Sequence, residues 1–372
     1  MNELMLDEPR SYADPDQSLS KLHRIQFTGT ANEYFRIWIV NLFLSVITLG
    51  VYAAWAKVRA RQYLYSNTVV DGQSFEYLGD PIAILKGNIL VAIAAACYYF
   101  SQLYQEVWMY VLLGIFGLFY PYLMYKSMRF MASSSAYRNI RFKFWGSLSD
   151  AYKYYLWWLL LVPPSLGLLF PLVHYYQRRY LLDNVSLGAA QSQFKGDVGR
   201  FYVVYLIAYG ISIGMTAIFT LIAFTSVFGA ILSGADPDSI LANVGSIIVL
   251  VVTGLAYLVM LLVGVGLQQY IYAQLLNHSL DNTSLNDGQI RFRSRINHWT
   301  LIKIQLVNIL AIVVSLGLLS PWAKIRYLKY VISRIGVIAP AGALDGLVAV
   351  SSQEDNAIGD AAAGFMDFDI GL

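Results

Sequence analysis

Long apolar segments alternate with short polar blocks along most of this chain. Apolar segments of roughly 20 residues, about the length that crosses a bilayer core, occur near 36–56, 87–104, 107–125, 154–173 and 300–320, and two longer segments cover 201–233 and 240–270. The chain is 57% hydrophobic and only 13% charged, well below the share of charged residues in soluble proteins. The pattern predicts a polytopic membrane protein.

The placement of lysine and arginine predicts which side of the membrane each polar block faces. All 26 of these residues lie in polar blocks, whereas the links 101–106 and 233–239 contain none. Because basic loops stay on the cytoplasmic side, we expect two transmembrane hairpins, at 82–125 and 201–272, with both chain termini in the cytoplasm.

Three apolar segments, 36–56, 154–173 and 300–320, have a basic block at both ends. A single crossing would place one block on the wrong side, so the charge rule favours re-entrant or in-plane helical hairpins. Each segment contains a turn signal that breaks a helix: Leu49-Gly50, Pro163-Pro164 with Leu166-Gly167, and Leu316-Gly317. The alternative, seven plain crossings, remains open because the charge bias is statistical.

A polar cassette recurs along the chain. Phe27, Gly29, Leu49, Gly50, Arg61, Tyr63, Leu64, Asn67 and Gly79 reappear 117 residues later as Phe144, Gly146, Leu166, Gly167, Arg178, Tyr180, Leu181, Asn184 and Gly196. A truncated third copy carries Leu316-Gly317 and Trp322-Ala323-Lys324 in place of Leu49-Gly50 and Trp55-Ala56-Lys57. We therefore expect a polar N-terminal segment (1–24), a first repeat (25–141), a second repeat (142–290), the third cassette (291–336) and an acidic flexible tail (337–372).

Short alternating stretches follow the cassettes, as in Phe75-Glu76-Tyr77 and Phe142-Lys143-Phe144. Such alternation after Asn, Asp and Gly is typical of short strands. They either pair into small cytoplasmic ribbons or only place aromatic rings among lipid headgroups. The expected fold is all-α, with transmembrane and re-entrant hairpins and short cytoplasmic β-like ribbons.

Few residues carry candidate chemistry. Asn41 and Asn308 occupy equivalent positions inside apolar segments, where an Asn marks either a helix contact or a polar pathway. No carboxylate lies in the core of an apolar segment, the four histidines lack metal-ligand spacing, and no nucleophile or phosphate-loop motif appears. We expect neither enzyme activity nor a cofactor or metal, and no nucleic-acid partner.

Basic residues of the cassettes are candidates for contact with lipid headgroups. These are Lys57, Arg59, Arg61, Arg178, Arg179, Lys324 and Arg326. Membrane lipids are the expected partners, and the sequence is compatible with a homo-oligomer.

The motif Leu49-Gly50-x4-Trp55-Ala56-Lys57-x-Arg59 and its variant at 316–326 resemble the YjgN-like family of bacterial inner-membrane proteins, a domain of unknown function. The resemblance covers about residues 25–336 and implies a multi-pass protein of the bacterial inner membrane. It implies no substrate and no catalytic residue. The second cassette departs from the motif, with His174 in place of Lys57.

Two functional hypotheses follow. The first is a channel or facilitator for small solutes or ions, based on the repeats, the re-entrant segments and the buried Asn residues. The alternative is a non-transporting membrane organiser that binds anionic lipid or recruits a cytoplasmic partner.

Overall fold

The computed structural model describes residues 20–104, 106–232, 244–340, 342–344 and 346–347. Residues 1–19 of the predicted N-terminal segment, the link 233–239 and most of the acidic tail therefore lie outside the described residues.

Eleven short strands form one antiparallel sheet in the order β1-β11-β10-β9-β8-β7-β6-β5-β4-β3-β2. They are β1 (Ser20–Arg24), β2 (Gln26–Phe27), β3 (Thr68–Val70), β4 (Gln73–Tyr77), β5 (Ser135–Tyr137), β6 (Ile140–Phe144), β7 (Val185–Leu187), β8 (Ala190–Phe194), β9 (Thr283–Leu285), β10 (Ile290–Ser294) and β11 (Ile335–Pro340).

The sheet is nearly closed into a barrel. The first and last strands in the order, β1 and β2, follow each other along the chain and are separated only by Ile25. The Ile25 amide continues the β1 pairing by donating to the Ile335 carbonyl, and the Thr28 amide donates to the Asn67 carbonyl beside β3. One segment thus joins both ends of the sheet, which removes the exposed edges that would otherwise pair with other chains.

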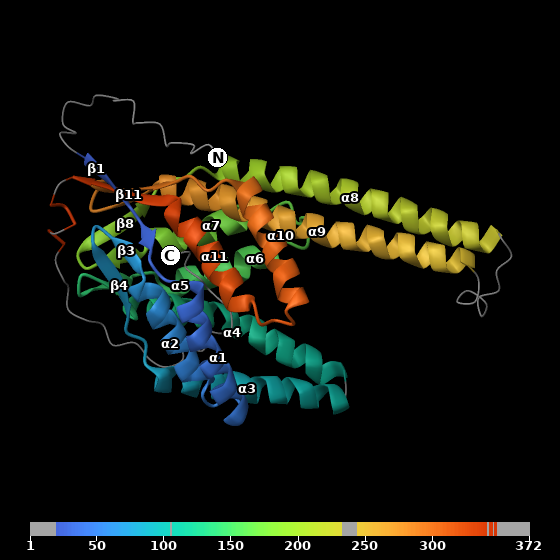
Figure 1. The fold of residues 1–372 in the computed structure, drawn as a ribbon, viewed down its shortest axis with the longest axis horizontal. Helices are drawn as coiled ribbons and strands as arrows, with labels where there is room; N and C mark the ends of the chain where they lie inside the picture. The colour runs from blue at the N-terminus through green and yellow to red at the C-terminus, as the bar shows by residue number, and fades with distance from the viewer. Residues whose placement is uncertain (1–19, 105, 233–243, 341, 345, 348–372) are drawn as a thin grey trace.

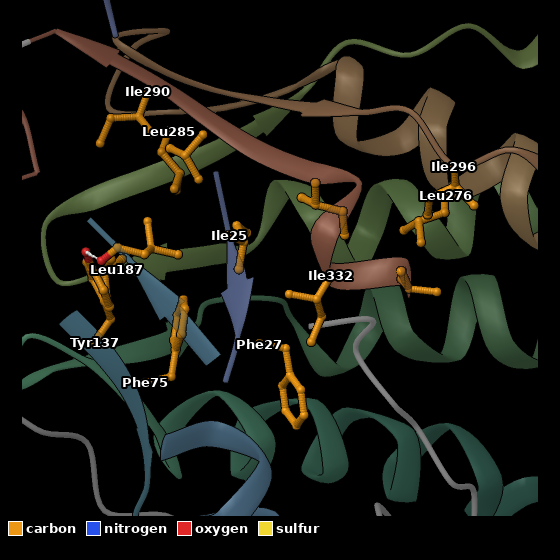
Figure 2. Close-up of a cluster of buried hydrophobic side chains, with 14 of the residues drawn as sticks. Ile25, Phe27, Phe75, Tyr137, Leu187, Leu276, Leu285, Ile290, Ile296 and Ile332 are labelled. Atoms are coloured by element: carbon orange, nitrogen blue, oxygen red, sulfur yellow. Dashed lines mark hydrogen bonds between the residues drawn. The ribbon is translucent and has the colours of Figure 1, made fainter. Parts of the chain in front are cut away.

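The prediction of an all-α fold is wrong. The strand-like stretches do not form separate ribbons, because each tight β-hairpin also pairs with the next one, as in β4 with β5 and β6 with β7. A two-stranded hairpin of this length is only marginally stable in water, so the ring of pairings is what makes these stretches strands. Apolar side chains from the strands form a buried cluster that includes Ile25, Phe75, Leu187 and Ile290 (Figure 2).

Helices fill every second connection. They are α1 (Ala31–Ile47), α2 (Ala53–Ser66), α3 (Pro81–Tyr104), α4 (Glu106–Ser133), α5 (Leu148–Tyr152), the π-helix η1 (Lys153–Trp157), α6 (Trp158–Leu160), α7 (Phe170–Asp183), α8 (Val198–Leu232), α9 (Val244–Asp281), α10 (His298–Val314) and α11 (Ser320–Ser333). Tight turns such as Asp71-Gly72, both with positive φ, fill the other connections.

This alternation places all the helices at one end of the barrel. In an antiparallel sheet, successive connections lie at opposite ends, so the tight turns occupy one end and five helical hairpins leave the other (Figure 1). Two of these are long hairpins, α3–α4 and α8–α9, and three are short hairpins: the first (α1–α2), the second (α5 to α7) and the third (α10–α11).

The five hairpins pack side by side in a ring. Around it, α2 contacts α3, α4 contacts α5 and η1, α7 contacts α8, α9 contacts α10, and α11 contacts α1. Segments of the long hairpins, Pro81–Phe100, Val107–Ser133, Val198–Thr225 and Val251–Asp281, are long and apolar enough to cross a membrane. The two expected hairpins are therefore present as pairs of long apolar helices that start and end at the barrel.

Candidate functional site: three short hairpins and a basic pocket

The three short hairpins share one construction, which begins at the tip. Each predicted turn signal breaks the helix, and the Leu and Gly of each turn both adopt positive φ, as at Leu49 (50°) and Gly50 (89°). The Gly amide then donates to the carbonyl five residues earlier, for example Gly50 to Ser45 at 2.7 Å. This is the hydrogen bond that closes a helix end when Gly follows in the left-handed region.

The tips are apolar and exposed. The leucines of the three turns, Leu49, Leu166 and Leu316, are 94%, 91% and 94% exposed. A leucine pays a steric cost in the left-handed region and gains nothing from this exposure in water. Neighbouring exposed residues, such as Val46 and Val313, extend the same apolar surface.

The arms of the hairpins are joined by buried amides. The Asn41 side-chain NH₂ donates to the Ala56 carbonyl at 3.2 Å, and the Asn308 NH₂ donates to the Ala323 carbonyl at 3.0 Å. Both Asn side chains are buried, and their Oδ1 atoms have no hydrogen-bond partner among the described residues. Each of these amides thus joins the two arms of its own hairpin.

In the second hairpin the hydrogen bond between the arms is donated by a side chain of the second arm, not of the first. Trp158 stands where Asn41 stands in the first hairpin, and Gln177 of α7 donates instead to the Tyr154 carbonyl at 3.2 Å. Trp158 packs its ring on Tyr176. The arms stay joined although the Asn is absent.

A tyrosine closes the base of each short hairpin. The Tyr180 hydroxyl of α7 donates to the carbonyl of Ser147, the residue before α5, at 2.7 Å, and burial raises the pKa of Tyr180, which keeps it a donor. Tyr63 and Tyr330 make equivalent contacts, Tyr63 with Thr30 and Tyr330 with Asn297. These tyrosines were visible in the repeat, but no role was assigned to them.

The first hairpin carries a further contact at its base. The Tyr63 hydroxyl shares its single proton between the Thr30 carbonyl at 3.1 Å and the Glu33 carboxylate at 2.8 Å. The hydrogen bond from Tyr63 is the main cause that lowers the pKa of Glu33.

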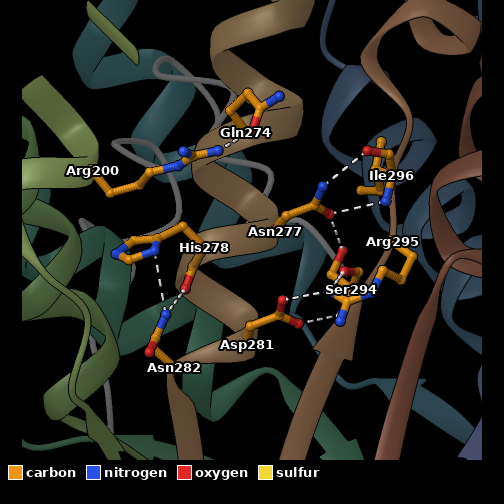
Figure 3. Close-up of polar contacts among 9 residues, drawn as sticks. All are labelled: Arg200, Gln274, Asn277, His278, Asp281, Asn282, Ser294, Arg295 and Ile296. Atoms are coloured by element: carbon orange, nitrogen blue, oxygen red, sulfur yellow. Dashed lines mark hydrogen bonds and ion pairs between the residues drawn. The ribbon is translucent and has the colours of Figure 1, made fainter. Parts of the chain in front are cut away.

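Acidic residues at the ends of two helices hydrogen-bond to strands of the barrel. The sequence analysis does not predict this role. Asp281, at the end of α9, accepts from the Ser294 amide at 2.8 Å and from Arg295 at 2.7 Å (Figure 3). Asp183, at the end of α7, accepts from the Phe194 amide at 2.7 Å in the same way. The signal was available, because each Asp directly precedes an Asn of the cassette.

Asn277 adds a second lock beside Asp281. Its side chain donates to the Ile296 carbonyl and accepts from the Ile296 amide, both at 2.9 Å, so it pairs with that backbone as a strand would (Figure 3). The base of the long hairpin α8–α9 is thereby held against the start of the third short hairpin.

The predicted headgroup residues separate into two groups. Lys57, Arg61 and Lys324 line one cavity of about 130 Å³ between α2 and α11, which we call the basic pocket. The remaining residues lie elsewhere: Arg59 is exposed on α2, Arg178 is half-buried near Ser279, Arg179 pairs with Asp183, and Arg326 lies over the Trp322 ring.

The sequence pattern of a family described as "Bacterial protein of unknown function (DUF898)" matches residues 22–365, most of the chain. The chain belongs to this DUF898 family. The match includes the whole barrel except the first residues of β1, together with all five helical hairpins.

Relatives with curated names are similar to this chain over nearly their full length. Inner membrane protein YjgN of Salmonella typhimurium is 27% identical, over 87% of this chain and 90% of the relative. Inner membrane protein YjgN of Escherichia coli K12 is 23% identical, over 89% of this chain and 92% of the relative. The predicted YjgN-like membership is confirmed. No solved structure matches this chain.

Proposed function

We propose that this DUF898 protein is a non-transporting, non-enzymatic organiser of the bacterial inner membrane that inserts its three short hairpins as wedges into the cytoplasmic leaflet. The observation that carries the proposal is the shared tip, in which an exposed leucine occupies a left-handed turn in all three hairpins. A tip of this kind is stable where hydrocarbon, not water, surrounds the leucine.

The dimensions of the short hairpins support insertion without a full crossing. The exposed apolar surface of the first hairpin begins at Phe35, about 14 residues from the tip at Leu49, which corresponds to roughly 20 Å of helix. A hydrocarbon core is about 30 Å thick. By contrast α8 has 35 residues, or roughly 52 Å, and is long enough to cross.

The common origin of the hairpins supports insertion from one side. All five leave the same end of the barrel, and the basic blocks include strands of the barrel itself, such as β6 and β10, so the barrel and both termini belong on the cytoplasmic side by the positive-inside rule. Three wedges in one leaflet expand that leaflet alone, which favours membrane curved toward the cytoplasm.

Cysteine labelling in membrane vesicles tests the insertion. The chain has a single cysteine, Cys97, which is first replaced by Ser. Single cysteines are then placed at Leu49, Leu166 and Leu316, with Asp287→Cys in the tight turn β9–β10 as the matched water-exposed control. We expect an impermeant maleimide to label Asp287→Cys from the cytoplasmic side and to label no tip from either side.

Two outcomes contradict the proposal. Labelling of the tips from the cytoplasmic side would place them in water, and labelling from the periplasmic side would mean that the short hairpins cross the membrane. The curvature effect is checked separately: the reconstituted protein should be enriched on vesicles of small diameter, and equal density on small and large vesicles would refute it.

A channel or facilitator for small solutes or ions is the second candidate. The closed ring of five hairpins favours it, because a ring of helices around an axis is how a pathway is built. Flux into proteoliposomes tests it. Flux that disappears when Asn41 and Asn308 are both changed to Leu would support this candidate, and absence of flux in the wild type would remove it.

A further inference from the structure

We propose that Arg178 anchors a binding site for a phosphate group, either free phosphate or the phosphate of an anionic lipid headgroup. The site lies near the base of the second short hairpin, outside the basic pocket, and its hydrogen-bonding groups come from η1, α7 and α9. This binding goes beyond the proposed membrane insertion, because it does not depend on where the hairpin tips lie.

Arg178 is half-buried and uses little of its hydrogen-bonding capacity. Its Nε donates to the Ser279 hydroxyl at 3.4 Å, which is longer than a typical hydrogen bond. The two NH₂ groups of the guanidinium have no hydrogen-bond partner among the described residues. An arginine binds phosphate with such groups, through two parallel hydrogen bonds.

The positive charge of Arg178 has no carboxylate partner within the part of the chain that the structure describes. A guanidinium keeps its proton at neutral pH. Acidic residues near the ends of the two contributing helices are paired elsewhere: Asp183 of α7 pairs with Arg179, and Asp281 of α9 pairs with Arg295. These carboxylates therefore do not neutralise Arg178.

The surroundings of Arg178 are partly desolvated and uncharged. Burial lowers the pKa of Arg178, and the groups that affect this pKa next are the side chains of Tyr272 and Tyr155. A tyrosine is neutral at neutral pH. Because a desolvated cation without a counter-ion costs free energy, an anion bound beside Arg178 stabilises the folded protein.

Two hydroxyl groups add further donors near Arg178. Tyr155 of η1 is only 3% exposed, interacts electrostatically with Arg178, and makes no hydrogen bond through its hydroxyl to a described residue. Ser279 of α9 is 1% exposed, and because its oxygen accepts from Arg178, its hydroxyl proton is left for a ligand. The guanidinium and both hydroxyls can donate, and phosphate offers only acceptor oxygens to such a set.

The construction of the hairpins does not require an arginine at this position. Arg178 lies two residues before Tyr180, which closes the base of the second hairpin. The residue two before Tyr330 in the third hairpin is Leu328, which packs against the buried cluster of the barrel. Since an apolar residue serves the structure there, the arginine of the second hairpin is better explained by binding than by packing.

Binding by the full-length protein in detergent tests the proposal. The probes are inorganic phosphate and short-chain phosphatidylglycerol, each measured by isothermal titration calorimetry. The site variants are Arg178→Gln and Tyr155→Phe, and the matched control is Arg179→Gln, which removes the same charge from the adjacent, exposed residue of α7. Thermal unfolding shows whether each variant is folded. Arg178→Lys keeps the charge but not the planar fork, and it replaces Arg178→Gln if that variant does not fold.

We expect each site variant to lower affinity about tenfold or more, because each loses a hydrogen bond to a charged group, and we expect the control to keep the affinity of the wild type. Binding of phosphatidylglycerol alone identifies a lipid headgroup, and binding of phosphate identifies a free anion; either result, with these losses, supports the site. Equal affinities of Arg178→Gln and Arg179→Gln, or no binding of either probe to the wild type, would overturn it. Cysteine labelling measures tip insertion separately, so failure of the site is distinguishable from failure of the proposed function.

Discussion

Replacing the tip leucines by asparagine distinguishes tips that lie in hydrocarbon from tips that lie in water. The change in the free energy of unfolding has opposite sign in the two environments. Leu316 has φ of 51°, a region that costs a leucine about 1–2 kcal/mol and that asparagine tolerates. If the tip lies in water, Leu316→Asn removes strain and loses no burial. The variant should then be about 1 kcal/mol more stable.

In hydrocarbon the balance reverses. Withdrawing the leucine side chain from an apolar environment costs roughly 1.5–3 kcal/mol, and placing an amide there costs about 2 kcal/mol more. With the relief of about 1–2 kcal/mol of strain subtracted, each tip should be destabilised by about 1.5–4 kcal/mol.

The assay is thermal unfolding of the protein in lipid nanodiscs. Changing all three tips, Leu49, Leu166 and Leu316, increases the signal, and the single variants check that the effects add. For a chain of 372 residues, an unfolding entropy of roughly 2 cal/mol/K per residue converts the loss into a fall in Tm of about 6–16 °C for the triple variant.

The reverse substitution in water is the control. Asp287 is exposed in the tight turn β9–β10 and has φ of 52°, so Asp287→Leu should lower Tm by only about 1 °C. A triple tip variant that is as stable as the wild type, or more stable, would refute the placement of the tips in hydrocarbon.

Two further predictions concern the packing of the barrel. A Cβ at Gly79 would lie too close to the Tyr77 hydroxyl, so Gly79→Ala should destabilise the protein by about 1–3 kcal/mol. The control is Gly114→Ala, which has nothing near the added Cβ and should not destabilise the protein. Equal Tm values for the two variants would contradict this prediction. Asp281→Ala should cost about 1–3 kcal/mol because it leaves the buried Ser294 amide without its acceptor. Asp281→Asn keeps an acceptor and loses only a half-exposed ion pair worth up to about 1 kcal/mol. Denaturant unfolding measures both variants, and equal losses for Asn and Ala would show that the ion pair, not the amide contact, matters.

The features that sequence reasoning predicted depend on residues close together in the chain. Glycine adopts positive φ freely, and its amide donates to a carbonyl only five residues earlier. These two local properties account for the helix breaks at Leu49-Gly50, Leu166-Gly167 and Leu316-Gly317. The apolar lengths of the long hairpins likewise followed from composition within each segment.

The barrel could not be predicted in the same way. Its closing pair joins Ser20 to Pro340, and no local pattern specifies a partner at that separation. The individual strands are three to six residues long in most cases, too short to signal more than a ribbon. The sequence therefore predicted only short ribbons beside a helical fold.

The sequence by itself determined that this chain belongs to a membrane, where its helices turn, and which polar residues recur, because each of these depends on side chains that are neighbours along the chain. Only the tertiary structure decided that the strands form one nearly closed barrel, that all five hairpins leave the same end of it, and that Lys57 and Lys324 line the same cavity. The reason is that strand pairing between distant hairpins is decided by the free energy of the whole closed ring, to which no single segment contributes enough to reveal its partner.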